Sequence, residues 1–181
     1  WEGGLVFYGG FIGAVATSVY YIRKHKQGFL KVADIFMPGV AIGHAIGRMG
    51  CFAAGCCYGR PADPSSWWAI IFPSNPFSLA PAGVPLIPSQ LLEAGAEFLI
   101  FFFLIFMGRR KKFDGEIFLL YLVLYSVSRS VLEAVRGDSL RGFLIPGILS
   151  TSQFISICLV ILAAIIYYAV HRKGVRSRIA L

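Results

Sequence analysis

The sequence predicts an all-α membrane protein, a polytopic bundle of about five transmembrane helices. Hydrophobic residues make up 57% of the 181 residues and charged residues only 14%, with a mean hydropathy of +0.71. A soluble domain has about 25% charged residues, so this chain lacks the polar groups to cover a water-exposed surface. Its apolar residues also form long runs between clusters of charge. These observations exclude a cytosolic enzyme, a disordered tail and a small disulfide-stabilised protein.

The first two predicted helices carry at most one charge each. Residues 5–22 carry none, and residues 35–59 carry only Arg48, which lies in the glycine-rich stretch 43–50. A helix of about 20 apolar residues crosses the hydrocarbon core of a bilayer. Both stretches are therefore long enough to span the membrane.

The other three predicted helices lie in the second half of the chain. Residues 88–108 contain two charged residues, Glu93 and Glu97, and residues 117–135 contain Arg129 and Glu133. Residues 142–170 contain no charge at all and are long enough for a span plus its entry. The sustained period-two alternation that indicates transmembrane strands is absent from these stretches, so helices are favoured throughout.

The basic residues predict which helix ends face the cytoplasm. Of the 17 lysines and arginines, 12 fall in three clusters after the first, third and fifth predicted helices. Cytoplasmic loops carry such an excess, so the chain is expected to begin outside the cytoplasm and end inside it. The net charge of +8 then reflects topology, and no nucleic-acid partner is expected. The clusters are Arg23, Lys24, Lys26 and Lys31; Arg109, Arg110, Lys111 and Lys112; and Arg172, Lys173, Arg176 and Arg178.

The whole chain, residues 1–181, is predicted to be one integral membrane domain. Residues 61–88 form a non-cytoplasmic loop rich in Pro and Ser, with Trp67 and Trp68 suited to the membrane interface. Residues 171–181 form a basic cytoplasmic tail.

The remaining five arginines lie on the outer side or within the predicted spans. A charge inside a span is costly and marks a candidate functional site. Most of these arginines are expected to lack acidic partners. Arginine binds phosphate through its planar fork, and every lysine lies on the cytoplasmic side, so we expect an anionic head-group site. A structural pair between Arg129 and Glu133, four residues apart, and an Arg48 that snorkels to the interface are the alternatives. The five are Arg48, Arg60, Arg129, Arg136 and Arg141.

Three of the four cysteines are close together in the sequence. The spacing C-x4-C-C places Cys51, Cys56 and Cys57 close to one another in the sequence and near His44. Cys158 lies in the last apolar stretch, where packing is expected. Small residues packed in a crowded turn are the favoured interpretation of the three. A disulfide and a soft-metal site remain alternatives, and no metal is expected.

Five motifs follow one another along the chain: GGLVFYGG at 3–10, IGRMGCF at 46–52 with Gly55, YGRP at 58–61, PSQLLE at 88–93 and Y-x3-R-x3-E at 125–133. Together they resemble those of the prolipoprotein diacylglyceryl transferases. The resemblance implies a seven-helix enzyme of the bacterial inner membrane with a periplasmic N-terminus and a cytoplasmic C-terminus. Such an enzyme moves the diacylglyceryl group of phosphatidylglycerol to the lipobox cysteine of a prolipoprotein. Because the chain starts at Trp1 and has five predicted spans, the family's first two helices are expected to be missing.

The same resemblance assigns roles to individual residues. Arg48 and Arg129 look like the family's two essential arginines, and Tyr8 and Glu133 complete the expected catalytic group. No cofactor is implied, and the expected partners are phosphatidylglycerol, prolipoprotein signal peptides and membrane lipids. The expected substrate-binding residues are Gly9, Gly10, Cys51, Gly59, Arg60, Ser89, Gln90, Tyr125 and Arg136.

The chain also departs from the family's pattern. Cys51 stands where the family usually has Asn, and Cys56 stands near its acidic residue. Tyr8 and Ile87 replace histidines that are often found there, which removes the family's candidate thiol bases. Two alternatives to the transferase follow: a phospholipid-binding membrane protein that has lost catalysis, and a membrane thiol-redox protein.

Overall fold

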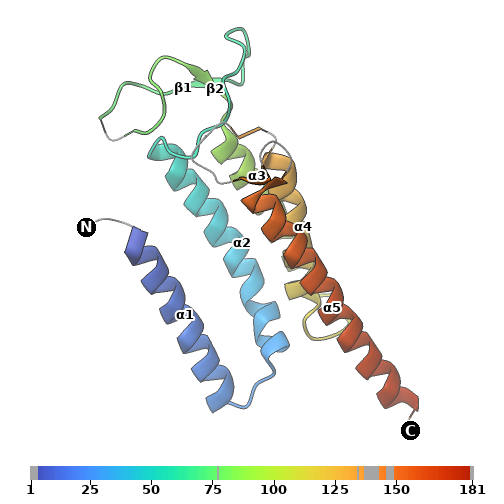
Figure 1. Cartoon of the computed structure of the whole chain (residues 1–181). Helices are drawn as coiled ribbons and strands as arrows, with labels where there is room; N and C mark the ends of the chain where they lie inside the picture. The colour runs from blue at the N-terminus through green and yellow to red at the C-terminus, as the bar shows by residue number, and fades with distance from the viewer. Residues whose placement is uncertain (1–3, 77, 134, 137–142, 146–148, 180–181) are drawn as a thin grey trace.

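The computed structural model describes residues 4–76, 78–133, 135–136, 143–145 and 149–179. Within these ranges the chain forms five long helices and two short strand pairs, which confirms the all-α class (Figure 1). The helices are α1 (Gly4–Lys24), α2 (Phe29–Ala53), α3 (Ser89–Gly108), α4 (Glu116–Glu133) and α5 (Thr151–Ile179). The strands are β1 (Ile70–Ile71), β2 (Pro85–Leu86), β3 (Phe143–Ile145) and β4 (Leu149–Ser150), paired antiparallel as β1–β2 and β3–β4.

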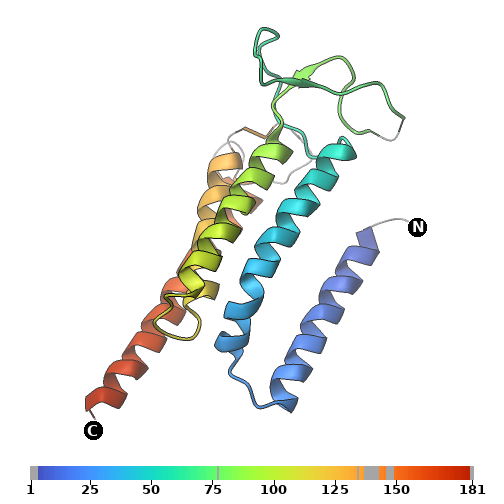
Figure 2. The same ribbon diagram turned by 180° about the vertical axis from the view of Figure 1, so that it is seen from behind.

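The helices run up and down beside one another. α2, α3, α4 and α5 pack together, whereas α1 lies to the far side of α2 (Figures 1 and 2). The β1–β2 loop lies at one end of the bundle. The turns after α1 and α3 lie at the other end, where α5 also ends (Figure 1). Two of the three basic clusters lie in or beside these turns and the third lies in the last turns of α5, so all three are at the same end of the bundle, as the sequence predicted.

The second predicted helix was wrong at both ends. α2 begins at Phe29 rather than at 35 and ends at Ala53 rather than at 59, so Asp34 lies inside it. The uncharged stretch from 142 was expected to hold a span plus its entry, and residues 143–145 and 149–150 are strands that precede the start of α5 at Thr151. Uncharged residues show where a chain can enter a membrane, whereas hydrogen bonds with neighbouring segments decide where a helix starts.

Among the described residues, α2, α3 and the part of α5 up to Val170 are long and apolar enough to cross a membrane. α4 has 18 residues and includes Glu116, Arg129 and Glu133. Large apolar side chains point away from the bundle, with Leu99 73% and Val131 64% exposed. Because such a surface is stable only against lipid, the chain is a membrane protein.

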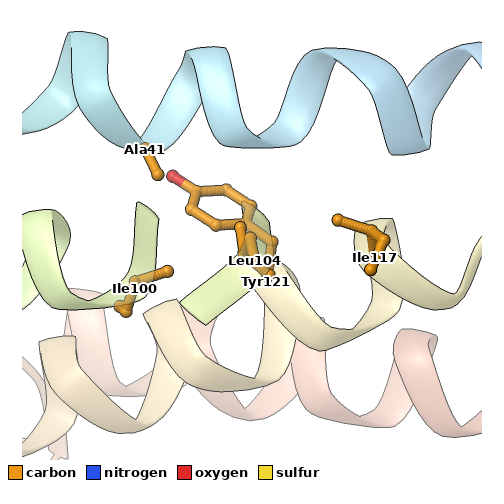
Figure 3. Close-up of a cluster of buried hydrophobic side chains, with 5 residues drawn as sticks. All are labelled: Ala41, Ile100, Leu104, Ile117 and Tyr121. Carbon is orange, nitrogen blue, oxygen red and sulfur yellow. The ribbon is translucent and has the colours of Figure 1, made fainter. Parts of the chain in front are cut away.

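A small hydrophobic core joins α2, α3 and α4. Ala41 of α2, Ile100 and Leu104 of α3, and Ile117 and Tyr121 of α4 form one cluster, in which the Tyr121 side chain points toward Ala41 (Figure 3). These residues are buried, and Ala41 and Leu104 are completely inaccessible. The small side chain of Ala41 lets the helices approach closely, which fixes the rotation of the faces that carry the polar residues.

At the end of the bundle that carries the basic turns, Asp34 of α2 caps the start of α4. Its buried carboxylate accepts hydrogen bonds from the backbone N–H groups of Gly115 at 2.8 Å and Phe118 at 2.9 Å. Lys111 lies 3.2 Å from the same carboxylate. A negative charge at a helix N-terminus is favourable because unpaired N–H groups point toward it, so Asp34 ties α4 to α2.

Candidate functional site

At the opposite end of the bundle, the buried Arg136 and the partly buried Arg48 and Arg129 meet one carboxylate. Glu93 of α3 lies 2.6 Å from Nε of Arg48 on α2 and 3.8 Å from Nη1 of Arg129 on α4. Nη1 of Arg136 donates a hydrogen bond to the same Glu93 side chain. The side chain of Glu93 is only 6% exposed, so its charge depends on these partners rather than on water. We call Arg48, Arg129, Arg136 and Glu93 the arginine cluster.

Glu133 adds a second carboxylate to the arginine cluster. Its Oε2 lies 2.7 Å from Nη2 of Arg129, which confirms the pair that the four-residue spacing predicts. Guanidinium groups thus outnumber these carboxylates three to two. The expectation that most of the arginines lack acidic partners was wrong, because α3 places Glu93 among all three.

One helical turn away, His44 of α2 contacts Glu97 of α3. Nδ1 of His44 lies 3.4 Å from Oε1 of Glu97, and the imidazole packs against the ring of Tyr125 at a centroid distance of 5.4 Å. The Glu97 side chain is 4% exposed. A narrow pocket connects these groups to the arginine cluster, lined by His44, Glu93, Glu97, Tyr125, Ser128, Arg129 and Leu132.

Sequence reasoning assigned no role to Glu93, Glu97 or His44. A signal was present, because His44 and Arg48 are four residues apart in one apolar helix and Glu93 and Glu97 are four apart in another. Such spacing places each pair on one helix face. When the two helices run antiparallel, Arg48 meets Glu93 and His44 meets Glu97, as the structure shows.

Ser89 and Gln90 hold the turn that follows α2. The Ser89 hydroxyl donates to the carbonyl oxygen of Cys57 at 2.9 Å, and Nε2 of Gln90 donates to that of Cys56 at 2.7 Å. Both side chains are completely buried. The residues expected to bind substrate therefore also fix the backbone beside the arginine cluster.

Gly59 lies where three segments come together. Its N–H donates to the carbonyl oxygen of Ile87 at 3.0 Å, and it pairs with Arg136 in an antiparallel bridge. A Cβ atom at Gly59 would lie 2.7 Å from Cβ of Ile87, so only glycine permits this approach. The bridge brings the backbone of Arg136 to the arginine cluster, whereas the neighbouring Arg60 is exposed.

Cys51, Cys56 and Cys57 converge at the end of α2. Their sulfur atoms lie within 4.8 Å of one another, and all three thiols are free. Burial, followed by the neighbouring Cys57 and Cys51, raises the pKa of the Cys56 thiol to about 12. Cys56 is therefore protonated near neutral pH and is not an activated nucleophile. The structure places the three side chains together in the turn after α2, and each of them is partly exposed.

The remaining predicted residues lie elsewhere. Tyr8, Gly9 and Gly10 belong to α1, in a stretch whose side chains lie outside the described part of the chain, and Arg141 lies outside the described residues altogether. Cys158 is exposed on α5, so the expectation that it packs inside the protein was wrong. In all, the structure brings Arg48, Arg129, Glu133, Arg136 and Tyr125 together and places Cys51, Gly59, Ser89 and Gln90 in or around the adjoining turn.

Comparison with known proteins agrees with the motif pattern. The family model described as prolipoprotein diacylglyceryl transferase matches residues 1–169. A phosphatidylglycerol–prolipoprotein diacylglyceryl transferase 2 of Clostridium perfringens is 41% identical over 171 residues, covering 94% of this chain and 64% of the relative. The transferase of Clostridium tetani is 38% identical over 164 residues, covering 91% of this chain and 63% of the relative. That of Geobacter sulfurreducens is 36% identical over 176 residues, covering 97% and 65%.

The match takes in nearly all of this chain, but the chain spans less than two thirds of the length of these relatives. The matched region includes every residue of the arginine cluster, the cysteine turn and the pocket beside Tyr125. The chain therefore belongs to the prolipoprotein diacylglyceryl transferase family.

Proposed function

We propose that this chain transfers the diacylglyceryl group of phosphatidylglycerol to the lipobox cysteine thiol of a prolipoprotein signal peptide. The observation that carries the proposal is the arginine cluster, buried at one end of an apolar bundle. Relatives that share 36–41% of their aligned residues with this chain are named for the same two substrates. A lipid head group with one phosphate matches a site where guanidinium groups outnumber carboxylates.

Arg48 and Arg129 are the proposed phosphate-binding and catalytic groups, with Arg136 beside them. In the reaction, the thiolate sulfur bonds to the terminal glyceryl carbon, the bond between that carbon and the phosphate oxygen breaks, and glycerol 1-phosphate leaves. Negative charge grows on the phosphate as the bond breaks. Fixed guanidinium groups stabilise that charge most strongly in the transition state, and Glu93 holds them in place beforehand.

His44 is the proposed acceptor of the thiol proton. The reaction needs a thiolate, and an imidazole is the side chain best suited to remove a proton near neutral pH. The buried Glu97 orients the ring through Nδ1 and stabilises the imidazolium that forms. His44 lines the same narrow pocket as Arg129 and Tyr125, and in the proposed reaction this pocket opens to admit the thiol beside the phosphate-binding arginines.

The other roles implied by the resemblance remain proposals. Tyr8 with Gly9 and Gly10 would approach the substrates from α1, and Glu133 would position Arg129. Cys51, Gly59, Arg60, Ser89, Gln90 and Tyr125 would shape the lipid-binding side of the site. Support for such a role comes from two hydrogen bonds: Ser89 donates to the carbonyl oxygen of Cys57, and Gln90 donates to that of Cys56.

We place the chain in the bacterial inner membrane, with its N-terminus on the periplasmic side and its C-terminus in the cytoplasm. Support comes from the basic clusters, which lie at the bundle end opposite to the arginine cluster (Figure 2). This orientation puts the arginine cluster in the outer leaflet, where a thiol of an exported protein can reach it. Residues 61–88 then form a loop on the periplasmic side.

A phospholipid-binding protein without catalysis is the second candidate. The observation that favours it is Tyr8, which stands where the family often has a histidine. Such a protein would keep the arginine cluster and bind anionic lipid but would transfer nothing.

Complementation separates the two candidates. Cells depleted of their own transferase are supplied with the full-length protein, and growth and prolipoprotein modification are measured. The transferase restores both, whereas Arg48→Ala and Arg129→Ala remove them and Arg110→Ala, in the opposite basic turn, does not. Failure of the wild-type protein to modify a prolipoprotein, together with retained binding of phosphatidylglycerol, would establish the second candidate instead.

A further inference from the structure

The cysteines at the end of α2 form a cluster whose thiols take no part in the bond-making and bond-breaking of the proposed transfer reaction. The sulfur atoms of Cys51, Cys56 and Cys57 lie within 4.8 Å of one another, and each side chain is partly exposed. A disulfide requires two thiols and leaves the third without a function. Three converging thiols are instead the donor set of a soft metal ion.

The backbone of the turn builds this convergence. The N–H of Cys56 donates to the carbonyl oxygen of Cys51 at 3.1 Å, which folds the chain back over the last turn of α2. Gly55 and Cys57 adopt left-handed φ values of 63° and 58°. This conformation is unfavourable for a residue with a Cβ atom, so the surroundings must impose it on Cys57.

Neighbouring side chains hold the turn from two sides. Ser89 and Gln90, both completely buried on α3, bind the carbonyl oxygens of Cys57 and Cys56. On the other side, Phe52, which follows Cys51, and Tyr58, which follows Cys57, pack against the buried loop residues Phe72, Ala80 and Leu86. The thiols are therefore positioned by the fold before any ligand binds, as effective metal sites require.

The distances suit three-fold coordination. Metal–sulfur bonds of about 2.3 Å place the sulfurs of a trigonal site about 4.0 Å apart, so the three thiols need to move by less than about 1 Å. Among the described residues, no fourth Cys, His, Asp or Glu joins the group. Soft thiolate donors select monovalent copper over hard cations.

We propose that Cys51, Cys56 and Cys57 bind one soft, thiophilic metal ion, of which monovalent copper is the best match, at the end of α2. Each thiol releases its proton to solvent on binding and coordinates as a thiolate. The ion joins the end of α2 to the start of the long loop. Cys51 also belongs to the proposed lipid-binding side of the site, so the test below measures metal binding itself and not transferase activity.

The test uses full-length protein, purified in detergent under anaerobic, reducing conditions. Cu(I) is titrated against a coloured Cu(I) chelator, and Cd²⁺ is titrated separately because its thiolate complexes absorb in the ultraviolet. We expect one ion per chain in both titrations, together with the thiolate-to-cadmium absorption band.

Serine variants identify the ligands. Cys51→Ser, Cys56→Ser and Cys57→Ser should each weaken Cu(I) binding by about tenfold or more, because a hydroxyl is a poor donor for a soft ion. Cys158→Ser is the matched control, since Cys158 lies on α5 outside the cluster, and it should bind as the wild type does. Circular dichroism and gel filtration check that each variant folds.

Two results would overturn the proposal. One is an absence of Cu(I) and Cd²⁺ binding by the reduced wild-type protein, and the other is undiminished binding by the triple serine variant. Thiol counting on protein prepared without reductant tests the alternative that these cysteines form a disulfide. Loss of two thiols from this cluster, combined with no metal binding after reduction, would assign the cysteines to thiol–disulfide chemistry.

Discussion

Arg48 of α2 and Glu93 of α3 form an ion pair across the interface of two antiparallel helices, with 2.6 Å between Nε and Oε2. The same carboxylate reaches Arg129 and Arg136, so a single acidic residue gathers arginines from three parts of the chain. Buried like charges repel strongly unless an opposite charge lies between them. Glu93 is thus the residue that allows the arginines to occupy one site.

Glu93→Gln is expected to destabilise the protein. The amide cannot balance three guanidinium groups, and removing one partner of a buried ion pair costs about 3–5 kcal/mol. Thermal unfolding in detergent measures the loss. Glu116→Gln is the control, because its amide oxygen can still accept the hydrogen bond from the Lys112 N–H, and it should cost less than about 1 kcal/mol. Equal losses in the two variants would contradict the central role of Glu93.

Arg129→Lys is expected to lower the proposed transferase activity although it keeps the charge. Lysine lacks the planar fork that holds two phosphate oxygens, and loss of one such donor typically costs about 10²–10³ in rate. Initial rates with phosphatidylglycerol and a lipobox peptide give the measurement. Arg110→Lys, in the turn at the other end of the bundle, should retain the wild-type rate. A fully active Arg129→Lys enzyme would show that charge alone is sufficient at this position.

His44→Gln is expected to lower kcat by about 10²–10⁴, the usual range for loss of a general base. KM for phosphatidylglycerol should change little, because the phosphate-binding arginines remain. This split between kcat and KM distinguishes a lost proton acceptor from a collapsed pocket, which would raise KM as well. His25→Gln, in the turn between α1 and α2, is the control. If wild-type protein is active and His44→Gln keeps its kcat, then another group removes the thiol proton.

Asp34→Asn is expected to loosen the start of α4. The amide keeps one acceptor oxygen but loses the negative charge and turns an N–H toward a helix N-terminus, at a cost of about 1–3 kcal/mol. Hydrogen exchange at Gly115 and Phe118, with the melting temperature, measures the effect. Asp114→Asn removes an exposed partner of the same Lys111 and should cost less than about 1 kcal/mol. Similar losses in both would show that the lysine contact, rather than the cap, is important.

Gly59→Ala is expected to destabilise the protein by about 1–3 kcal/mol, because overpacking forces neighbouring atoms apart. The added methyl group would meet Ile87 and separate the bridge that carries Arg136. Loss of transferase activity should therefore accompany the lower melting temperature. Gly95→Ala, where nothing lies within 4 Å of the added Cβ, should leave both unchanged or raise stability slightly. A stable and active Gly59→Ala variant would remove the steric argument.

Local features of the site could be predicted from the sequence. The Arg129–Glu133 pair followed from four-residue spacing, since a helix places such residues on one face whatever surrounds it. The convergence of the cysteines was open to several interpretations, because spacing does not fix the φ values of Gly55 and Cys57. Contacts between helices, such as those of Glu93 with its arginines, depend on how each helix is rotated about its axis, and small packing residues such as Ala41 decide that rotation.

The sequence alone determined the class of the protein, its five helices and the separation of its basic clusters from its buried arginines. These properties follow from hydropathy and charge, which act on each segment independently. Only the tertiary structure decided that Glu93 pairs with three arginines, that Asp34 caps a helix other than its own, and that His44 lies beside Glu97 and Tyr125. Each of these contacts joins residues far apart in the sequence, and it exists because the apolar faces of α2, α3 and α4 pack in one arrangement.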